Sequence, residues 1–166
     1  SRVSVVELTD SLLPGADRDL VKPLHKRLGN LFEAIRLNTK VTGLKDNVKG
    51  VDVSFEGPEG QTTETFSRVL VAVGRRPNSD GIGLENTDVV MDSKGFVEVD
   101  KQQRTADSHM LAIGDVCGEP MLAHRASHQG KVAVESLHGE PALFEPRAIP
   151  AVVFTDPEIA WAGLTE

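Results

Sequence analysis

The stretch Met110-Leu-Ala-Ile-Gly-Asp-Val-Cys-Gly118 is the part of the sequence that decides the fold. Residues 110–113 are typical of a short buried strand, and a helix-like segment rich in small residues follows Asp115. A strand that ends at a helix N-terminus exposes backbone N–H groups and a partial positive charge, which suit phosphate. Open α/β sheets bind nucleotides at this junction. We therefore expect a nucleotide cleft here, with the Asp115 carboxylate accepting hydrogen bonds from sugar or ribityl hydroxyls.

Asp115 also has a second interpretation, because aspartate is a preferred N-cap residue of helices. In that case its side chain binds the first N–H groups of the helix and contacts no ligand. This segment alone leaves both interpretations open.

The composition fits one ordinary globular domain or parts of two. The chain has 166 residues, of which 39% are hydrophobic, and a net charge of -7. Its basic residues form no long run, so we expect no nucleic-acid partner. No apolar run approaches the roughly 18 to 20 residues of a membrane helix, and the first residues do not resemble a signal peptide. We expect a cytoplasmic protein without a membrane partner.

The single cysteine, Cys117, cannot form an intramolecular disulfide, and we interpret it as a small residue in a turn. The chain begins within a strand pattern and ends on Gly163-Leu164-Thr165-Glu166, a capping signal that is typical of the start of a helix. These two ends indicate a piece of a longer protein.

Strand and helix patterns alternate along the first half of the chain. Val3–Glu7 is typical of a buried strand that ends on a carboxylate, and apolar residues three and four apart predict a helix from Asp17. Pro23 predicts that this helix starts late or bends. Short alternating runs between residues 35 and 66 predict an antiparallel meander. The five apolar residues 69–73 predict a strand that is covered on both faces.

The second half of the chain predicts one helix and several short strands. Residues 79–95 have the composition of a connection, and 96–99 that of a brief strand. A helix is expected from about Leu122 to His138, with small residues on one face that permit close approach to a sheet or a ligand. Two strands are expected at 149–154 and 159–162.

Two further positions are candidates for nucleotide binding. Glu7 ends the first strand, where a carboxylate can bind both hydroxyls of an adenosine ribose and repel a 2′-phosphate, which favours NAD over NADP. Gly74 follows the apolar run and permits close approach of a ligand to the backbone, with Arg75 and Arg76 beside it. The alternative for Gly74 is a tight turn followed by two solvated arginines.

A metal site is a weaker interpretation of the predicted helix. His124 and His128 are four residues apart, the spacing that presents two imidazoles to a metal. The same stripe contains Lys131, Glu135 and His138, and a mixed stripe is more typical of a solvated or interface face. We therefore predict no metal, and the sequence has no motif typical of a hydrolase or a kinase.

Several segments, taken in order, resemble the dihydrolipoamide dehydrogenase family of flavoprotein disulfide oxidoreductases. They are Val3–Glu7, Leu13-Pro14-Gly15-Ala16-Asp17, the run 69–78 with its Gly74-Arg75-Arg76-Pro77-Asn78 end, Ala112-Ile113-Gly114-Asp115, Pro120–His124 and Ile149–Gly163. The resemblance implies an α/β fold of incomplete Rossmann-like three-layer nucleotide-binding units, with a parallel sheet plus an antiparallel β-meander, and the start of an α+β interface domain. The implied domains are a partial NAD-binding domain at 1–79, the C-terminal part of an FAD-binding domain at 80–146, and the start of a dimerisation domain at 147–166.

The resemblance also implies which residues bind cofactors. Asp115 and Ala123 are implied for FAD, and the helix after Ala123 directs its N-terminus at the isoalloxazine ring. The chain has none of the family's redox cysteines, and no catalytic residue is implied. The NAD-binding residues that the resemblance implies are Glu7, Val41, Ala72, Val73, Gly74 and Arg75, and Met121, Leu122 and His124 complete the implied cofactor-binding set.

The intact enzyme that the resemblance implies is a cytoplasmic homodimer that oxidises dihydrolipoamide through a redox disulfide and FAD, and passes hydride to NAD. Its partner is a lipoyl domain of a 2-oxo acid dehydrogenase or glycine cleavage complex. We expect this chain alone to be inactive, because its hydride path is incomplete. One alternative is an NADPH-dependent flavoprotein disulfide reductase, although residues 8–10 supply no basic side chain for a 2′-phosphate. Another is a non-catalytic nucleotide-binding module that associates through exposed sheet edges.

Overall fold

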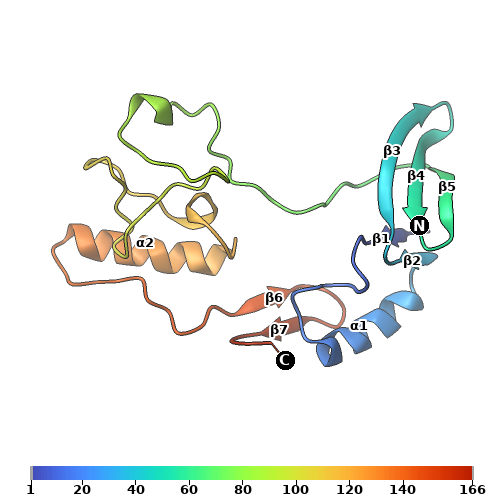
Figure 1. Cartoon of the computed structure of the whole chain (residues 1–166). Coiled ribbons are helices and arrows are strands. Elements are labelled where there is room, and N and C mark those ends of the chain that lie inside the picture. Colours follow the sequence, from blue (N-terminus) through green and yellow to red (C-terminus); the bar gives the residue numbers. More distant parts are fainter. Residues whose placement is uncertain (1, 166) are drawn as a thin grey trace. The chain divides into compact units, whose positions relative to one another are not determined.

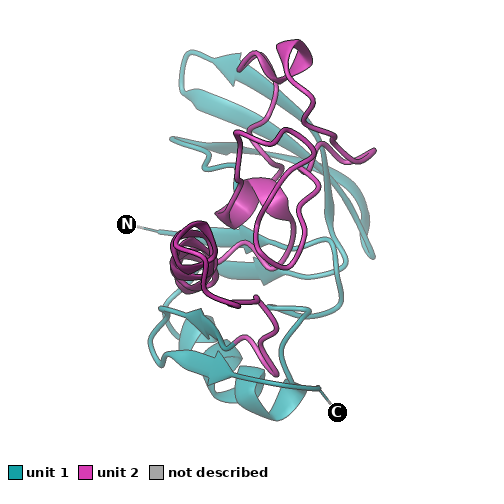
Figure 2. Cartoon of the chain, turned by 90° about the vertical axis from the view of Figure 1, so that its left-hand side faces the viewer, with its two compact units in different colours: residues 1–72, 150–166 teal, residues 73–149 magenta. Residues whose placement is uncertain are grey.

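The computed structural model describes residues 2–165, which form two compact units. Unit 1 comprises residues 1–72 and 150–166, and unit 2 comprises residues 73–149 (Figure 2). Unit 1 contains β1, α1, β2, β3, β4 and β5 and, after unit 2 in the sequence, β6 and β7 (Figure 1). Glu166, the last residue of the expected capping signal, lies outside the described residues.

The start of unit 1 is a βαβ arrangement of Rossmann type. β1 (Ser4–Val6) pairs in parallel with β2 (Ala34–Arg36), and Val5 lies opposite Ile35. α1 (Arg18–Gly29) forms the crossover between them, as a parallel pair requires. The predicted first strand and the predicted helix after Asp17 are confirmed.

α1 begins at Arg18 and continues through Pro23. Of the two predicted alternatives, a late start or a bend, the late start is therefore wrong. An interior proline costs about 3 kcal/mol. However, Val21 and Leu24 are buried on either side of it in a core shared with Leu12 and Ile159. Burial of two such side chains contributes roughly 3 to 6 kcal/mol, which is enough to offset the proline.

The meander forms as predicted, with one difference in pairing. β3 (Lys40–Asn47), β4 (Gly50–Gly57) and β5 (Gly60–Phe66) make an antiparallel sheet in the order β3-β4-β5 (Figure 1). Val53 and Phe55, two residues apart on β4, are its buried side chains. The first alternating run of the prediction, at residues 35–37, is not part of the meander, because β2 pairs with β1 instead.

The two predicted C-terminal strands are also confirmed. β6 (Ala151–Val153) and β7 (Ile159–Trp161) form an antiparallel pair. Ile159 belongs to the α1 core, and Arg27 of α1 forms an ion pair with Asp156 at 2.9 Å. This hairpin therefore belongs to the same packed unit as α1.

Unit 2 consists of loops around one long helix, α2 (Ala123–Leu137), together with the short 3-10 helices η1 (Leu84–Asn86) and η2 (Gly114–Cys117). The predicted helix at 122–138 is confirmed, because its N-cap is Leu122 and its C-cap is His138. The small-residue face makes the expected close approach. A Cβ on Gly130 would lie 3.2 Å from Ile113 Cδ1.

Three predicted strands do not form, at residues 69–73, 96–99 and 110–113. Leu70 and Val73 are each 91% exposed, and the other two segments make only the isolated bridges Met91 to Val97 and Arg104 to Leu111. An apolar run becomes a strand only where a neighbouring strand satisfies its N–H and C=O groups. Within residues 2–165 no strand lies beside these segments, so they form no strands although their residues are apolar.

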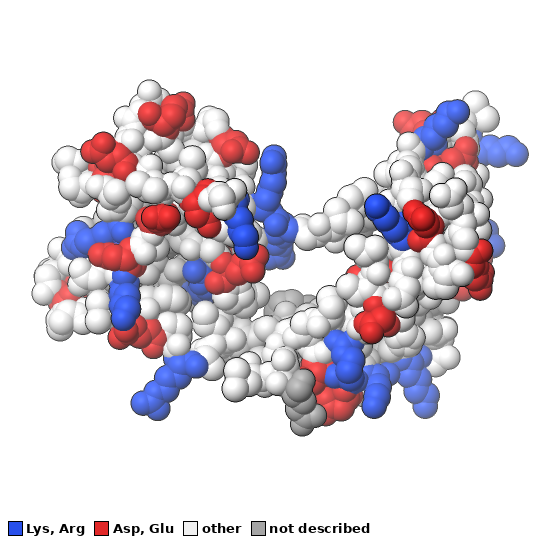
Figure 3. Space-filling model, viewed as in Figure 1, with Lys and Arg blue, Asp and Glu red and all other residues white. Residues whose placement is uncertain are grey.

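The surface carries charges of both signs. Acidic and basic side chains are interspersed over the face in Figure 3. Within residues 2–165, the helices are too short or too polar to cross a membrane.

Candidate cofactor-binding site

The Asp115 carboxylate lies exposed on η2, at the surface of unit 2. Extended backbone at Ile113 leads into Gly114, whose φ of 79° reverses the chain. Only glycine adopts this conformation without strain. The expected strand-to-helix junction is therefore a single 3-10 turn, and residues 118–122 separate it from α2.

Asp115 does not act as a helix cap. The N-cap of η2 is Ile113, that of α2 is Leu122, and neither helix has a side-chain cap hydrogen bond. The capping interpretation of Asp115 is wrong. The carboxylate is instead displayed on a turn whose backbone is held in place.

The positive dipole end at the N-terminus of α2 is not neutralised by an acidic residue of the helix itself. The N-cap Leu122 has an apolar side chain, and no acidic residue stands in the first turn. Met121 and Leu122 are half-buried, whereas Ala123 and His124 are exposed. The first N–H groups of a helix attract anions where no acidic cap competes for them.

The segment before α2 is tied to the turn at Gly74. Arg75 Nη1 donates a hydrogen bond to the Met121 carbonyl oxygen at 2.8 Å. Gly74 has a φ of 92°, and no atom lies within 4 Å of the position that a Cβ would occupy. Arg76, by contrast, is exposed and pairs with exposed Asp80 at 3.7 Å. Arg76 is thus solvated, and Arg75 links two predicted cofactor-binding segments.

Glu7 lies directly after β1 and is half-buried. Its Oε1 accepts hydrogen bonds from the Thr9 backbone N–H at 2.8 Å and from Thr9 Oγ1 at 2.9 Å. Its backbone N–H donates to the Arg36 carbonyl oxygen, and its own carbonyl oxygen accepts from Thr39 N–H. The carboxylate is therefore fixed in direction at the carboxyl end of a parallel strand.

The predicted NAD-binding residues are divided between the two units. Val41, on β3, is 44% exposed and belongs to unit 1 together with Glu7 and exposed Ala72. Val73 and the residues after it belong to unit 2.

Cys117 lies on η2 two residues after Asp115, in the turn where the sequence placed it. Burial raises the pKa of its thiol to about 11, and the nearby Arg125 charge only partly opposes this. The thiolate is the reactive form of cysteine, so this thiol is a poor nucleophile at neutral pH.

The histidine stripe of α2 is engaged in packing and in a surface ion pair. The His128 ring packs edge-on against Phe144, with ring centroids 5.0 Å apart, and Lys131 lies 3.6 Å from Glu135. Within residues 2–165 no three His, Cys, Asp or Glu side chains cluster closely enough to hold a metal.

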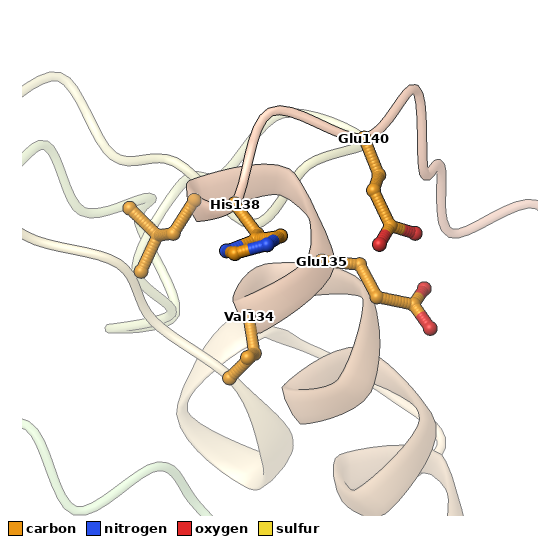
Figure 4. A pocket seen from close by; sticks show the side chains of 5 residues that line it. Val134, Glu135, His138 and Glu140 are labelled. Atoms are coloured by element: carbon orange, nitrogen blue, oxygen red, sulfur yellow. The ribbon is translucent and has the colours of Figure 1, made fainter.

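A hollow of about 430 Å³ lies at the C-terminal end of α2 (Figure 4). It contains none of the predicted cofactor-binding residues, which lie before this helix or in its first turn. The candidate site is therefore the N-terminal end of the helix with the Asp115 turn. The hollow is lined by Val134, Glu135, Leu137, His138 and Glu140.

Two buried polar residues at the candidate site are missing from the sequence predictions. Arg125 and Gln129, 8% and 1% exposed, both contact the turn at Gly114. A sequence signal exists, because the two lie four residues apart among the small residues of the predicted helix face. Polar side chains on a face that is otherwise built for close approach indicate a specific buried partner.

Comparison with known proteins agrees with this geometry. Residues 1–130 match the pyridine nucleotide-disulphide oxidoreductase family, and the chain belongs to this family. The predicted α/β fold with a parallel sheet and antiparallel sheets is thereby confirmed.

Among individual proteins, the chain is similar to dihydrolipoyl dehydrogenases. The identity is 44% to that of Vibrio cholerae and 41% to that of Bacillus subtilis, over 100% and 98% of this chain. In both cases the match covers 35% of the relative, so the chain spans about a third of the length of these relatives.

Two solved structures are also similar to this chain. LpdA from Mycobacterium tuberculosis matches with a TM-score of 0.84 and 31% identity, over 96% of this chain and 34% of the other. The HOCl-induced flavoprotein disulfide reductase RclA from Escherichia coli matches with a TM-score of 0.87 and 26% identity, over 100% of this chain and 38% of the other. The predicted resemblance is confirmed at the level of the family.

Proposed function

We propose that this chain is the central part of a dihydrolipoyl dehydrogenase that oxidises protein-bound dihydrolipoamide through a redox disulfide and FAD and passes hydride to NAD. The observation that carries the proposal is the exposed Asp115 carboxylate on a fixed turn, in the same unit as an α2 N-terminus with an apolar N-cap. The whole-chain similarity to dihydrolipoyl dehydrogenases supports it.

The residues of unit 2 fit a flavin dinucleotide. Asp115 offers a carboxylate acceptor for ribityl hydroxyls, and the first turn of α2, at Ala123 and His124, offers a positive dipole end. Met121 and Leu122 lead into that turn, and the Arg75 hydrogen bond holds Met121. FAD, when bound, supplies the two-electron transfer chemistry. This chain binds and orients the cofactor.

Glu7 favours NAD as the second cofactor. A ribose with free 2′ and 3′ hydroxyls can donate to the Glu7 carboxylate, whose direction Thr9 fixes through Oε1. A 2′-phosphate would meet Glu7 and, three residues later, Asp10, with no basic side chain between them. Val41, Ala72, Val73, Gly74 and Arg75 complete the proposed NAD-binding set, and the open space around Gly74 permits close approach of a ligand to its backbone.

The remaining expectations belong to the same proposal. The protein-bound substrate is dihydrolipoamide on a lipoyl domain of a 2-oxo acid dehydrogenase or glycine cleavage complex, and the enzyme is a homodimer. Residues 1–79 contribute to the NAD-binding domain, 80–146 to the FAD-binding domain and 147–166 to the dimerisation domain. A cytoplasmic location is part of the proposal, because the acidic composition favours it.

The test uses the full-length protein that contains this chain. We expect purified protein to carry flavin absorbance and to reduce NAD with dihydrolipoamide. Asp115→Ala should weaken FAD binding by about tenfold or more, because it removes a charged acceptor. Asp80→Ala, which removes an exposed carboxylate elsewhere in unit 2, is the matched control. Full flavin affinity in the Asp115 variant would contradict the proposal.

A second measurement separates the NAD-dependent enzyme from the NADPH-dependent alternative. We expect NAD to be strongly preferred over NADP, and Glu7→Gln to reduce this preference because it removes the negative charge that repels a 2′-phosphate. Glu59→Gln, in an exposed turn, is the control. Faster turnover with NADPH in the unmodified protein would favour the disulfide reductase interpretation.

A further inference from the structure

Both backbone hydrogen-bonding groups of Gly114 are held by side chains of α2. The Gly114 N–H donates to Gln129 Oε1 at 2.8 Å, and the Gly114 carbonyl oxygen accepts from Arg125 Nη1 at 3.3 Å. Arg125 Nη1 also donates to the carbonyl oxygen of Gly118, at 2.7 Å. Two side chains one helical turn apart thus fix both ends of the η2 turn, with Asp115 between them.

Steric contact completes this fixation. Gly114 is buried against the same helix, and a Cβ at this position would lie 3.1 Å from Ala126 Cβ. One residue further along the chain, the Asp115 side chain is exposed. The backbone beside Asp115 is therefore rigid, whereas its carboxylate is free to meet a ligand.

Both of these polar side chains are buried. Gln129 is 1% exposed and Arg125 is 8% exposed. Arg125 has no acidic side chain within ion-pair distance among residues 2–165, and its guanidinium contacts carbonyl oxygens and lies 6.0 Å from the Phe144 ring centre. An unpaired buried cation is costly to desolvate, and it favours a nearby anion.

We propose that Gln129 and Arg125 are positioning residues that hold the η2 turn, so that the Asp115 carboxylate meets the ribityl hydroxyls of FAD. The proposal rests on the proposed function. Gln129 sets the direction of the turn through the Gly114 N–H. Arg125 holds the two carbonyl oxygens at Gly114 and Gly118 and adds positive charge beside the η2 turn. Neither side chain needs to touch the cofactor.

The test is a double-mutant cycle on FAD affinity in the full-length protein, with FAD binding measured by flavin fluorescence. Gln129→Leu removes the acceptor of the Gly114 N–H at nearly constant volume, and we expect about tenfold weaker FAD binding. Gln129→Glu keeps an oxygen at this position and should stay within about twofold of the unmodified protein. Ser136→Ala is the matched control, because Ser136 is buried on the same helix but bonds to Arg104.

The cycle distinguishes positioning from general stabilisation. If Gln129 acts through Asp115, Gln129→Leu should cost no further affinity in an Asp115→Ala background. Hydrogen exchange of the peptide that covers residues 110–118 should rise in Gln129→Leu and stay low in Gln129→Glu. Arg125→Gln should also weaken FAD binding, and this effect should persist in the Asp115→Ala background to the extent that the charge itself attracts the pyrophosphate.

Three outcomes would overturn the inference. Unchanged FAD affinity in Gln129→Leu is one, and an equal loss in Ser136→Ala is another. The third is an undiminished effect of Gln129→Leu in the Asp115→Ala background. Failure of the proposed function has a different signature, because Asp115→Ala alone would then bind FAD as tightly as the unmodified protein.

Discussion

Arg75 Nη1 donates a 2.8 Å hydrogen bond to the Met121 carbonyl oxygen, and so joins two segments that lie 46 residues apart in the sequence. One segment is the glycine turn that we assign to NAD, and the other leads into the α2 N-terminus that we assign to FAD. A guanidinium has several donors in a rigid fork, so it can hold a carbonyl oxygen and still offer N–H groups to another acceptor. The bond therefore couples the positions of two proposed cofactor-binding segments.

Removal of this bond should loosen the segment before α2 with only a small loss of stability. We expect Arg75→Ala to lower the free energy of unfolding by less than about 1.5 kcal/mol, because the bond is exposed and competes with water. Hydrogen exchange of residues 118–123 should increase. Arg76→Ala is the control, since exposed Arg76 pairs with the exposed Asp80 carboxylate. Equal exchange in both variants would contradict a role for Arg75 in holding Met121.

Gly114 should be the glycine of unit 2 that is least tolerant of substitution. Alanine there has both an unfavourable φ of 79° and a contact of 3.1 Å with Ala126 Cβ. Gly139, with a φ of 90° and no atom within 4 Å, carries the backbone strain alone. We expect Gly139→Ala to cost about 1 kcal/mol and Gly114→Ala to cost about 2 to 4 kcal/mol, measured by urea denaturation. Equal losses of unfolding free energy in the two variants would mean that α2 moves away from residue 114 without cost, and would contradict this prediction.

The sequence predicts local structure well where the partner of a segment lies close by in the chain. β1 and α1 follow each other within residues 4–29, and β3, β4 and β5 are joined by short turns, so periodicity is enough to predict them. The pattern at residues 35–37 predicted an extended segment but assigned it to the meander, whereas β2 pairs with β1. The strand predicted at residues 69–73 does not form, for the opposite reason. Their apolar character is real, but a strand in a parallel sheet depends on distant neighbours that a local pattern does not contain.

Site prediction had the same limit. Asp115, Gly74 and Glu7 could be found because each follows an apolar run and has a side chain or backbone suited to a nucleotide. Gln129 and Arg125 have only one sequence signal, their spacing of four residues on the predicted helix. Their importance lies in hydrogen bonds to the backbone of Gly114, and a sequence pattern does not reveal such bonds. The Arg75 to Met121 bond is another such contact.

Asp107 should make the stability of unit 2 decrease as the pH becomes acidic. The His109 backbone N–H donates to its Oδ1 at 2.9 Å, and this bond holds the pKa of the Asp107 carboxyl below its ordinary value of 3.8. A lowered pKa in the folded state contributes stability above pH 3.8, which is lost as the pH falls through the folded-state value. We therefore expect Asp107→Asn to be less stable than the unmodified protein at neutral pH, with the difference vanishing in acid. Thermal unfolding at a series of pH values measures this, with Asp80→Asn as the control, and a difference that persists in acid would contradict the assignment.

Cys117 should make the stability of the protein fall on the alkaline side. Burial raises the pKa of its thiol from 9.0 to about 11, so between these pH values the folded state holds a proton that the unfolded state has lost. Stability must then decrease as the pH rises from about 9 to about 11, because unfolding releases that proton. Cys117→Ser, which does not titrate there, should show a flatter decline.

The burial of Cys117 also predicts slow reaction of the native protein with a thiol reagent at neutral pH and fast reaction in urea. Rapid labelling of the folded protein would show that the thiol is accessible and ionised, and would remove the physical basis for treating it as a packed residue of the Asp115 turn.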